Sequence, residues 1–141
     1  MEFSNVETIK HKDAIIAIII YQNHRKEGVE FFTPGDFSQQ LAFMSHKAGK
    51  VIKAHAHNMV KRDIHFTQET LFIKKGKLKV NLYDNDNNHF DTRVLGAGDI
   101  VLLCSGGHGF EVLEDVDMVE VKQGPYISDS DKTVFKGIEE N

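Results

Sequence analysis

The chain has 141 residues, which suits one domain with a sizeable buried core. Asp and Glu outnumber Lys and Arg by 21 to 17, and no basic run is dense enough for a nucleic-acid surface, so a nucleic-acid partner is excluded. The single cysteine excludes an internal disulfide, and the longest apolar stretch is only strand length, which excludes a membrane-spanning helix. With no recognisable signal peptide, we expect a cytoplasmic protein without a membrane partner.

The first third of the chain predicts short strands separated by turns. Residues 1–12 are mixed in character and predict an edge strand or an arm. Residues 14–21 are continuous, apolar and β-branched, which indicates a strand buried on both faces, against a second sheet or against a second subunit. Two more strands are expected at residues 29–33 and 40–45, on either side of a Pro-Gly turn.

The remaining two thirds continue this pattern. Residues 51–57 and 64–73 predict strands, and in the second of these His65, Thr67, Glu69 and Leu71 share a face. Lys75 and Gly76 predict a turn, after which Leu78, Val80 and Leu82 point inward. Later strands are expected at residues 90–95, 100–103, 110–113 and 118–122, with turns that include 84–88 and 114–115. About ten short strands without a convincing helix predict an all-β sandwich or barrel.

Four side chains have the chemistry of metal ligands. His55 and His57 are two residues apart, so in a strand their imidazoles project from the same face. Glu69 and His108 can complete the set. Three nitrogens and one oxygen suit a first-row divalent metal such as Fe, Mn, Ni or Zn, with coordination positions left open for a substrate or a water.

The glycine spacing around these residues resembles the first motif of the cupin superfamily. Five residues separate Gly49 from His55, which opens a His-x-His pair with His57, and six residues separate Glu69 from Gly76. Eleven residues lie between His57 and Glu69, where the family has three or four.

A second stretch resembles the second cupin motif. Gly98 is followed by Gly106 and then by His108. Cys104 stands where the family commonly has proline, and His108 comes one residue early. Four elements in the right order make the resemblance more specific than a lone His-x-His pair.

The resemblance implies a double-stranded β-helix, or jelly-roll, barrel with the site inside its mouth. It implies one domain over residues 1–141, with a metal-motif core at about residues 40–123 and a polar tail at residues 124–141. In that tail, we expect residues 132–135 to dock on the sheet and residues 137–141 to fray. Residues 1–39 are expected to extend the sheet or to form a dimer surface, because cupins often pair through such sheets, and a homodimer is expected.

The resemblance implies a fold and a metal more firmly than a reaction. Cupins include isomerases and epimerases, oxygenases, and ligand sensors, and fold does not decide among them. The chain is similar to short cupins associated with bacterial surface-polysaccharide biosynthesis. That similarity favours a metal-dependent enzyme for a carbohydrate-like or other small polar substrate, of the isomerase/epimerase or dioxygenase type. The alternative is a non-catalytic module that binds a sugar or another metabolite.

The other histidines and the cysteine have several interpretations. His65 is a candidate catalytic residue for proton transfer, a replacement ligand for Glu69, or a loop histidine in contact with water. Cys104 lies in an apolar run and is predicted to be a buried, inert thiol. Glu111, Glu120 and Lys122 lie on late strands whose inward face the pattern does not determine. The histidines in polar stretches are predicted to lie on the surface: His11, His24, His46 and His89.

Overall fold

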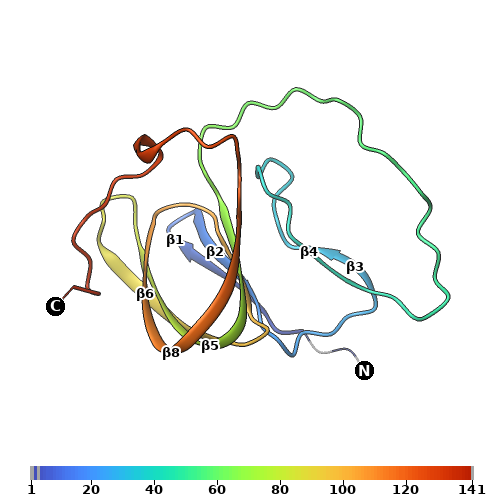
Figure 1. The fold of residues 1–141 in the computed structure, drawn as a ribbon, viewed down its shortest axis with the longest axis horizontal. Helices are drawn as coiled ribbons and strands as arrows, with labels where there is room; N and C mark the ends of the chain where they lie inside the picture. The colour runs from blue at the N-terminus through green and yellow to red at the C-terminus, as the bar shows by residue number, and fades with distance from the viewer. Residues whose placement is uncertain (1, 3, 141) are drawn as a thin grey trace.

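The computed structural model describes residues 2 and 4–140 as an all-β molecule (Figure 1). The strands within these residues are β1 (Val6–His11), β2 (Ala14–Ile20), β3 (Gly28–Phe31), β4 (Ala42–Ser45), β5 (Glu69–Tyr83), β6 (His89–Gly96), β7 (Ile100–Leu103) and β8 (Gly107–Lys122). One short 3-10 turn, η1 (Asp129–Asp131), follows them. No helix in the described residues is long and apolar enough to cross a membrane.

Six of the strands form one curled antiparallel sheet. Its order is β1-β2-β7-β5-β6, and β8 pairs with β5 along the whole length of β5. Figure 1 shows this sheet curling into a half-barrel, while β3 and β4 form a separate hairpin beside it. The prediction of an all-β, barrel-class fold is confirmed. A half-barrel is compatible with a cupin-like fold, and the closed jelly roll stays a prediction.

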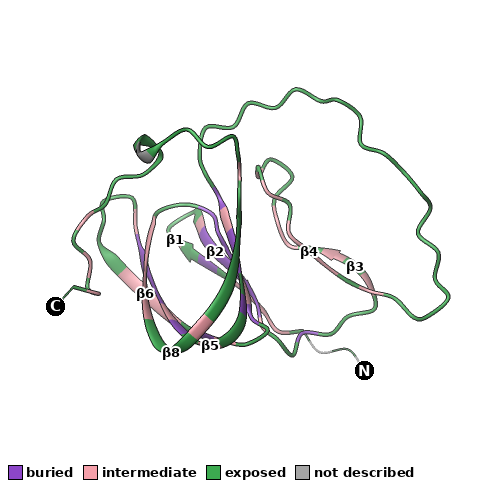
Figure 2. Ribbon diagram, in the orientation of Figure 1, coloured by how far each residue is buried: buried purple, intermediate pink, exposed green. Residues whose placement is uncertain are grey.

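The core lies inside the curl of the sheet. Leu78, Val80 and Leu82 of β5 are buried there, as their alternation predicts, together with Leu71, Ile73 and residues of β2, β6 and β7. Figure 2 shows the buried residues gathered on these strands. Burial of each such side chain contributes about 1.5–3 kcal/mol to folding. The half-barrel is therefore held together from within, by side chains that alternate along its central strands.

The strand β2 is buried on both faces, as its continuous apolar sequence predicts. Ala17 and Ile19 face the core inside the curl. Ile18 faces the other way, with Leu102 and Cys104, and is covered by partly buried side chains that include Phe32, Phe37 and Leu41. Phe32 and Leu41 flank the β3–β4 hairpin, and a backbone hydrogen bond from Phe32 to Leu41 extends it. The outer face of β2 is therefore covered by a second layer of the same chain. Of the two predicted partners for this strand, a second sheet or a second subunit, the structure shows the first.

The predicted turns at Lys75-Gly76 and at residues 114–115 are wrong, because β5 and β8 each continue through these positions. The pairing register between the two strands shifts between Ile73 and Leu78, which marks β-bulges. Gly76 has a φ of 87°, and a Cβ there would lie 2.7 Å from the carbonyl carbon of Asp115. The glycine therefore marks a sharp bend within a long strand, made jointly by β5 and β8.

Residues 46–66 form an extended segment, here called the arm, which contains no strand. The strand predicted at residues 51–57 is absent, and the strand predicted at residues 64–73 begins only at Glu69. Every residue from His46 to Thr67 is exposed. Figure 1 shows the arm as a wide green arc that swings away from the half-barrel.

The two ends of the chain are tied to the sheet. The edge strand predicted within residues 1–12 is β1, with residues 1 and 3 outside the described residues. At the other end, the Ile138 amide donates to the Tyr83 hydroxyl at 2.9 Å, and the Asn81 side chain donates to Glu139 at 2.8 Å. The prediction that the tail frays is therefore wrong for residues 137–140, since buried polar groups of β5 anchor them, while Asn141 lies outside the described residues.

Candidate functional site

Two of the four predicted ligands meet at the mouth of the half-barrel. Glu69 is the first residue of β5 and pairs with Leu103, whereas His108 lies on β8 and pairs with Leu82. Both partners belong to the core cluster, so both side chains project from the inner face of the sheet. The His108 Nε2 atom lies 3.4 Å from the Glu69 Oε2 atom. The curl of β5 thus joins residues that are far apart in the sequence.

This spacing suits a shared metal ion. Two donors that each lie about 2.1 Å from a tetrahedral ion are about 3.4 Å apart. The hydrogen bond with His108 lowers the pKa of the Glu69 carboxyl, and burial offsets this only in part. The carboxylate is therefore held ionised, which is the form that binds a cation.

A cavity of about 810 Å³, here called the mouth cavity, surrounds this pair. Glu120 and Lys122 of β8 line it as well, and they pair with Leu71 and Glu69, which places them on the inner face. Lys122 also lowers the pKa of Glu69 through its charge. These two polar side chains complete a cavity wall with both charge signs, suited to a small polar ligand. The sequence named both residues but left their face of the strand open, because Met118, Val119 and Val121 make both faces of β8 apolar at this end.

The other two predicted ligands, His55 and His57, lie on the arm. Their rings face each other edge to face, with centroids 5.5 Å apart, and both are exposed. The Nδ1 atom of His55 is 2.9 Å from the carbonyl oxygen of Lys53. Because a carbonyl oxygen only accepts, Nδ1 carries the proton and Nε2 is left with its lone pair for a metal.

The structure therefore brings together Glu69 and His108, but it does not bring His55 and His57 to them. Within residues 2 and 4–140, no three His, Cys, Asp or Glu side chains are grouped so that they could hold a metal ion. The four-ligand centre stays a prediction, with one half at the mouth cavity and the other half on the arm.

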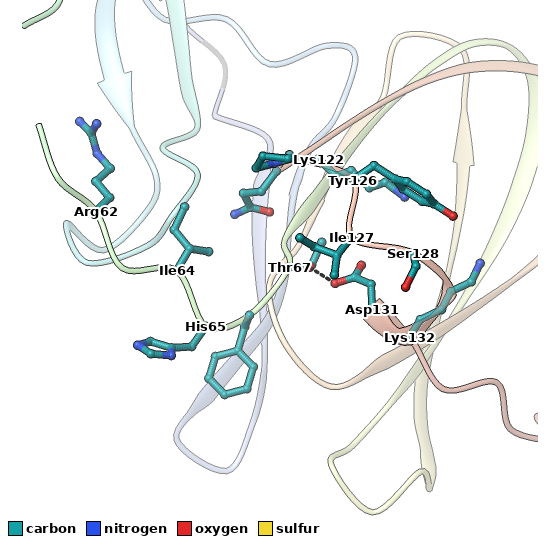
Figure 3. Close-up of a pocket in the computed structure, with 14 residues that line it drawn as sticks. Arg62, Ile64, His65, Thr67, Lys122, Tyr126, Ile127, Ser128, Asp131 and Lys132 are labelled. Atoms are coloured by element: carbon teal, nitrogen blue, oxygen red, sulfur yellow. Dashed lines mark hydrogen bonds between the residues drawn. The ribbon is translucent and has the colours of Figure 1, made fainter. Parts of the chain in front are cut away.

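His65, the predicted catalytic residue, lines a neighbouring cavity of about 440 Å³, here called the side cavity. Figure 3 shows His65 pointing away from Thr67 and Asp131, whose hydroxyl and carboxylate are 2.9 Å apart. Thr67, Lys122, Asp131 and Lys132 line both cavities. His65 thus lies beside the candidate site and outside the mouth cavity.

The remaining residues of the sequence analysis divide into correct and wrong predictions. His46 and His89 are exposed as predicted, and His11 is half-buried against Phe90. The surface position predicted for His24 is wrong, because its ring is buried against Phe32 and Phe43 and accepts a hydrogen bond from the Asn5 amide. Cys104 is buried as predicted, which raises the pKa of its thiol to about 12.

No family model, no curated protein and no solved structure matches the chain.

Proposed function

We propose that the chain is a cupin-like metal-binding protein with its metal centre at the mouth of the half-barrel. Glu69 and His108 form the part of the centre on the barrel, and His55 and His57 form the part on the arm. One observation carries this proposal: a carboxylate and an imidazole converge at 3.4 Å on the inner face of a polar cavity, at the spacing of two ligands of one ion.

The residues around the pair favour an enzyme for a small polar substrate, such as a carbohydrate-like molecule. A bound iron, manganese, nickel or zinc ion would supply Lewis-acid polarisation of a substrate oxygen. Lys122 and Glu120 offer a hydrogen-bond donor and an acceptor that orient hydroxyl groups in the mouth cavity. Such a site suits isomerase, epimerase or oxygenase chemistry, with His65 at its border as the candidate for proton transfer.

The test of this proposal is elemental analysis of protein purified without an affinity tag or chelator. We expect close to one metal ion per chain in the wild type. His108→Ala should lose most of the metal, and so should the double variant His55→Ala/His57→Ala. His89→Ala, which removes an exposed histidine outside the proposed ligand set, is the matched control and should keep full occupancy. Full occupancy in all the variants would refute the ligand assignment.

A second candidate function is a non-catalytic module that binds a sugar or metabolite without a metal. The Glu69–His108 pair favours it, since the two groups already satisfy each other and together offer an acceptor and a donor to a ligand. Equilibrium dialysis of metal-free protein against a panel of monosaccharides and small acids separates the two functions. Binding that is unchanged by metal removal and lost in Glu69→Gln supports the module, whereas binding that requires metal supports the centre.

A further inference from the structure

The outer edge of β8 has no partner strand. Among the described strands, β8 pairs only with β5, so one side of its sixteen residues keeps backbone donors and acceptors turned away from the sheet. Near the end of β8, the Gln39 side chain donates to the Val121 carbonyl at 3.4 Å. Because this donor is a side chain, it does not make a strand partner for β8. A long edge strand with unpaired backbone groups is a template for pairing with another extended segment.

The side chains of β8 are also left uncovered. Five of its large apolar side chains are exposed: Val112, Leu113, Met118, Val119 and Val121. They are interspersed with acidic residues, and β8 has a net charge of −4: Glu111, Glu114, Asp115, Asp117 and Glu120 against a single Lys122. Glu111 and Glu114 form ion pairs with Lys79 and Lys77 of β5, so Asp115 and Asp117 are the carboxylates of the strand best placed to meet a basic partner. The edge of the half-barrel is thus apolar and acidic at once.

The arm has the matching properties. Six of its large apolar side chains are exposed: Val51, Ile52, Met59, Val60, Ile64 and Phe66. It contains Lys47, Lys50, Lys53, Lys61 and Arg62 against a single Asp63, so its net charge is +4 with histidine neutral. After a turn at Gly49, Figure 1 shows the arm as an open arc without a helix, so no helix has to unfold before it can pair as a strand. An extended, apolar, basic segment and an unpaired, apolar, acidic strand edge are complementary in shape and in charge.

The fold does not pair the arm with β8 of its own chain among the described strands. Figure 1 shows the arc of the arm running around the β3–β4 hairpin, and only its last residues return to the half-barrel, where His65 and Phe66 line the side cavity with Lys122 at the end of β8. The hairpin from which the arm departs exposes Val29, Phe31 and Met44, which adds a third apolar surface at the base of the arm. Exposed apolar surface of this kind marks an interaction site, and a symmetric pair of copies would cover the arm and the edge of β8 at once.

From these observations we infer that two copies of the chain exchange their arms. The arm of one copy lies along the free edge of β8 of the second copy, and the second arm does the same in return. Such an exchange doubles every contact and makes an interface of the standard size or larger, about 1,200–2,000 Å². If the proposed metal centre is correct, on which this step rests, His55 and His57 of one copy meet Glu69 and His108 of the other.

The interface is tested by reversing charges on one side at a time. Lys50→Glu/Lys53→Glu brings the net charge of the arm from +4 to 0, and Asp115→Lys/Asp117→Lys brings the net charge of β8 from −4 to 0. Light scattering at micromolar concentration and about 50 mM salt should show a wild-type dimer. Each variant alone should be mainly monomeric, because neither then has an arm and an edge of opposite charge. An equimolar mixture should again form dimers, since in the mixed dimer the arm of charge +4 from one copy meets the edge of charge −4 of the other. Lys10→Glu/Lys12→Glu, on β1 and in the turn that follows it, is the matched control and should stay dimeric.

A second experiment asks whether the metal centre is shared. His55→Ala/His57→Ala keeps an intact barrel, and Glu69→Gln/His108→Ala keeps an intact arm. After the two are mixed under mild denaturation and refolded, a mixed dimer should contain one complete site, and bound metal should rise well above that of either variant. A variant pair that gains no metal on mixing, although the wild type is loaded, overturns the exchange at the site.

The two proposals fail in different ways. A wild-type protein that binds metal but is monomeric overturns the arm exchange and leaves the proposed function standing. A wild-type protein without metal whose dimer depends on the arm and β8 charges overturns the proposed metal centre and supports the exchange. Charge variants that stay dimeric alone overturn the exchange directly, whatever the metal content.

Discussion

Replacing Gly76 by alanine tests the bend that brings Glu69 and His108 together. Gly76 has a φ of 87°, in the region that costs a residue with a Cβ about 1–2 kcal/mol. The new Cβ would also overlap the carbonyl oxygen of Asp115 and lie 2.7 Å from its carbonyl carbon, whereas ordinary carbon contacts are about 3.5 Å. Relief of these contacts needs β8 to move away from β5 by more than about 0.8 Å, at an overpacking cost of about 1–3 kcal/mol. The expected loss in free energy of unfolding is therefore about 2–5 kcal/mol.

Two other glycines separate the two parts of this cost. Gly28 has a φ of 90° with no atom within 4 Å of a new Cβ, so Gly28→Ala should show only the backbone part, about 1–2 kcal/mol. Gly35 has neither a positive φ nor a close neighbour, so Gly35→Ala should be neutral or slightly stabilising.

The assay is urea unfolding of the three variants beside the wild type, followed by circular dichroism. With a typical slope of 1–3 kcal/mol per molar urea, a loss of about 3 kcal/mol lowers the midpoint by at least about 1 M. Equal midpoints for Gly76→Ala and Gly28→Ala would refute the steric argument. A Gly35→Ala variant as unstable as Gly76→Ala would show that neither the positive φ nor the steric contact at Gly76 determines the loss in stability.

Three further predictions concern other parts of the sheet. Arg93 binds both oxygens of Glu7 at 2.9 and 2.7 Å and lowers the pKa of that carboxyl. Because both groups are partly exposed, Glu7→Gln should cost only about 0.5–1 kcal/mol at pH 7. Because the pKa of Glu7 is lowered in the folded state, the stability difference between wild type and Glu7→Gln is present above the ordinary pKa of 4.5 and disappears as the pH falls below it. Urea unfolding at several pH values measures this difference, and the exposed Glu27→Gln is the control. The buried Cys104 thiol, whose pKa burial raises to about 12, should react with iodoacetamide at pH 8 only after unfolding, as mass spectrometry would show. Tyr83→Phe removes the hydroxyl that binds Ile138 and Glu139, and trypsin should then cleave after Lys136 faster than in the wild type.

Local sequence patterns predicted what local physics determines. The alternation of Leu78, Val80 and Leu82 predicted their burial, because a strand with one buried face needs that period. The continuous apolar run of β2 predicted burial on both faces, because a strand buried on both sides has apolar residues at successive positions. These predictions need no knowledge of which strands are neighbours in the sheet.

Patterns failed where distant residues decide the structure. A bulge at Gly76 and a turn at Gly76 have the same local sequence, and the register of β8 decides between them. His24 has polar neighbours in the sequence, yet Phe32 and Phe43 bury it after the chain returns. In both places the missing information is a contact between segments far apart along the chain.

The arm is the clearest case of the same limit. Its His-x-His pair is a property of three residues, so the sequence predicts the pair, but a strand exists only when a second strand supplies its hydrogen bonds. Among the described residues no strand pairs with the arm, and no strand but β5 pairs with β8. The same missing contact therefore leaves two of the predicted ligands on the arm and two at the mouth cavity. In the proposed exchange, the arm of one copy and the edge of the other supply that contact, which would bring the two halves of the predicted centre together.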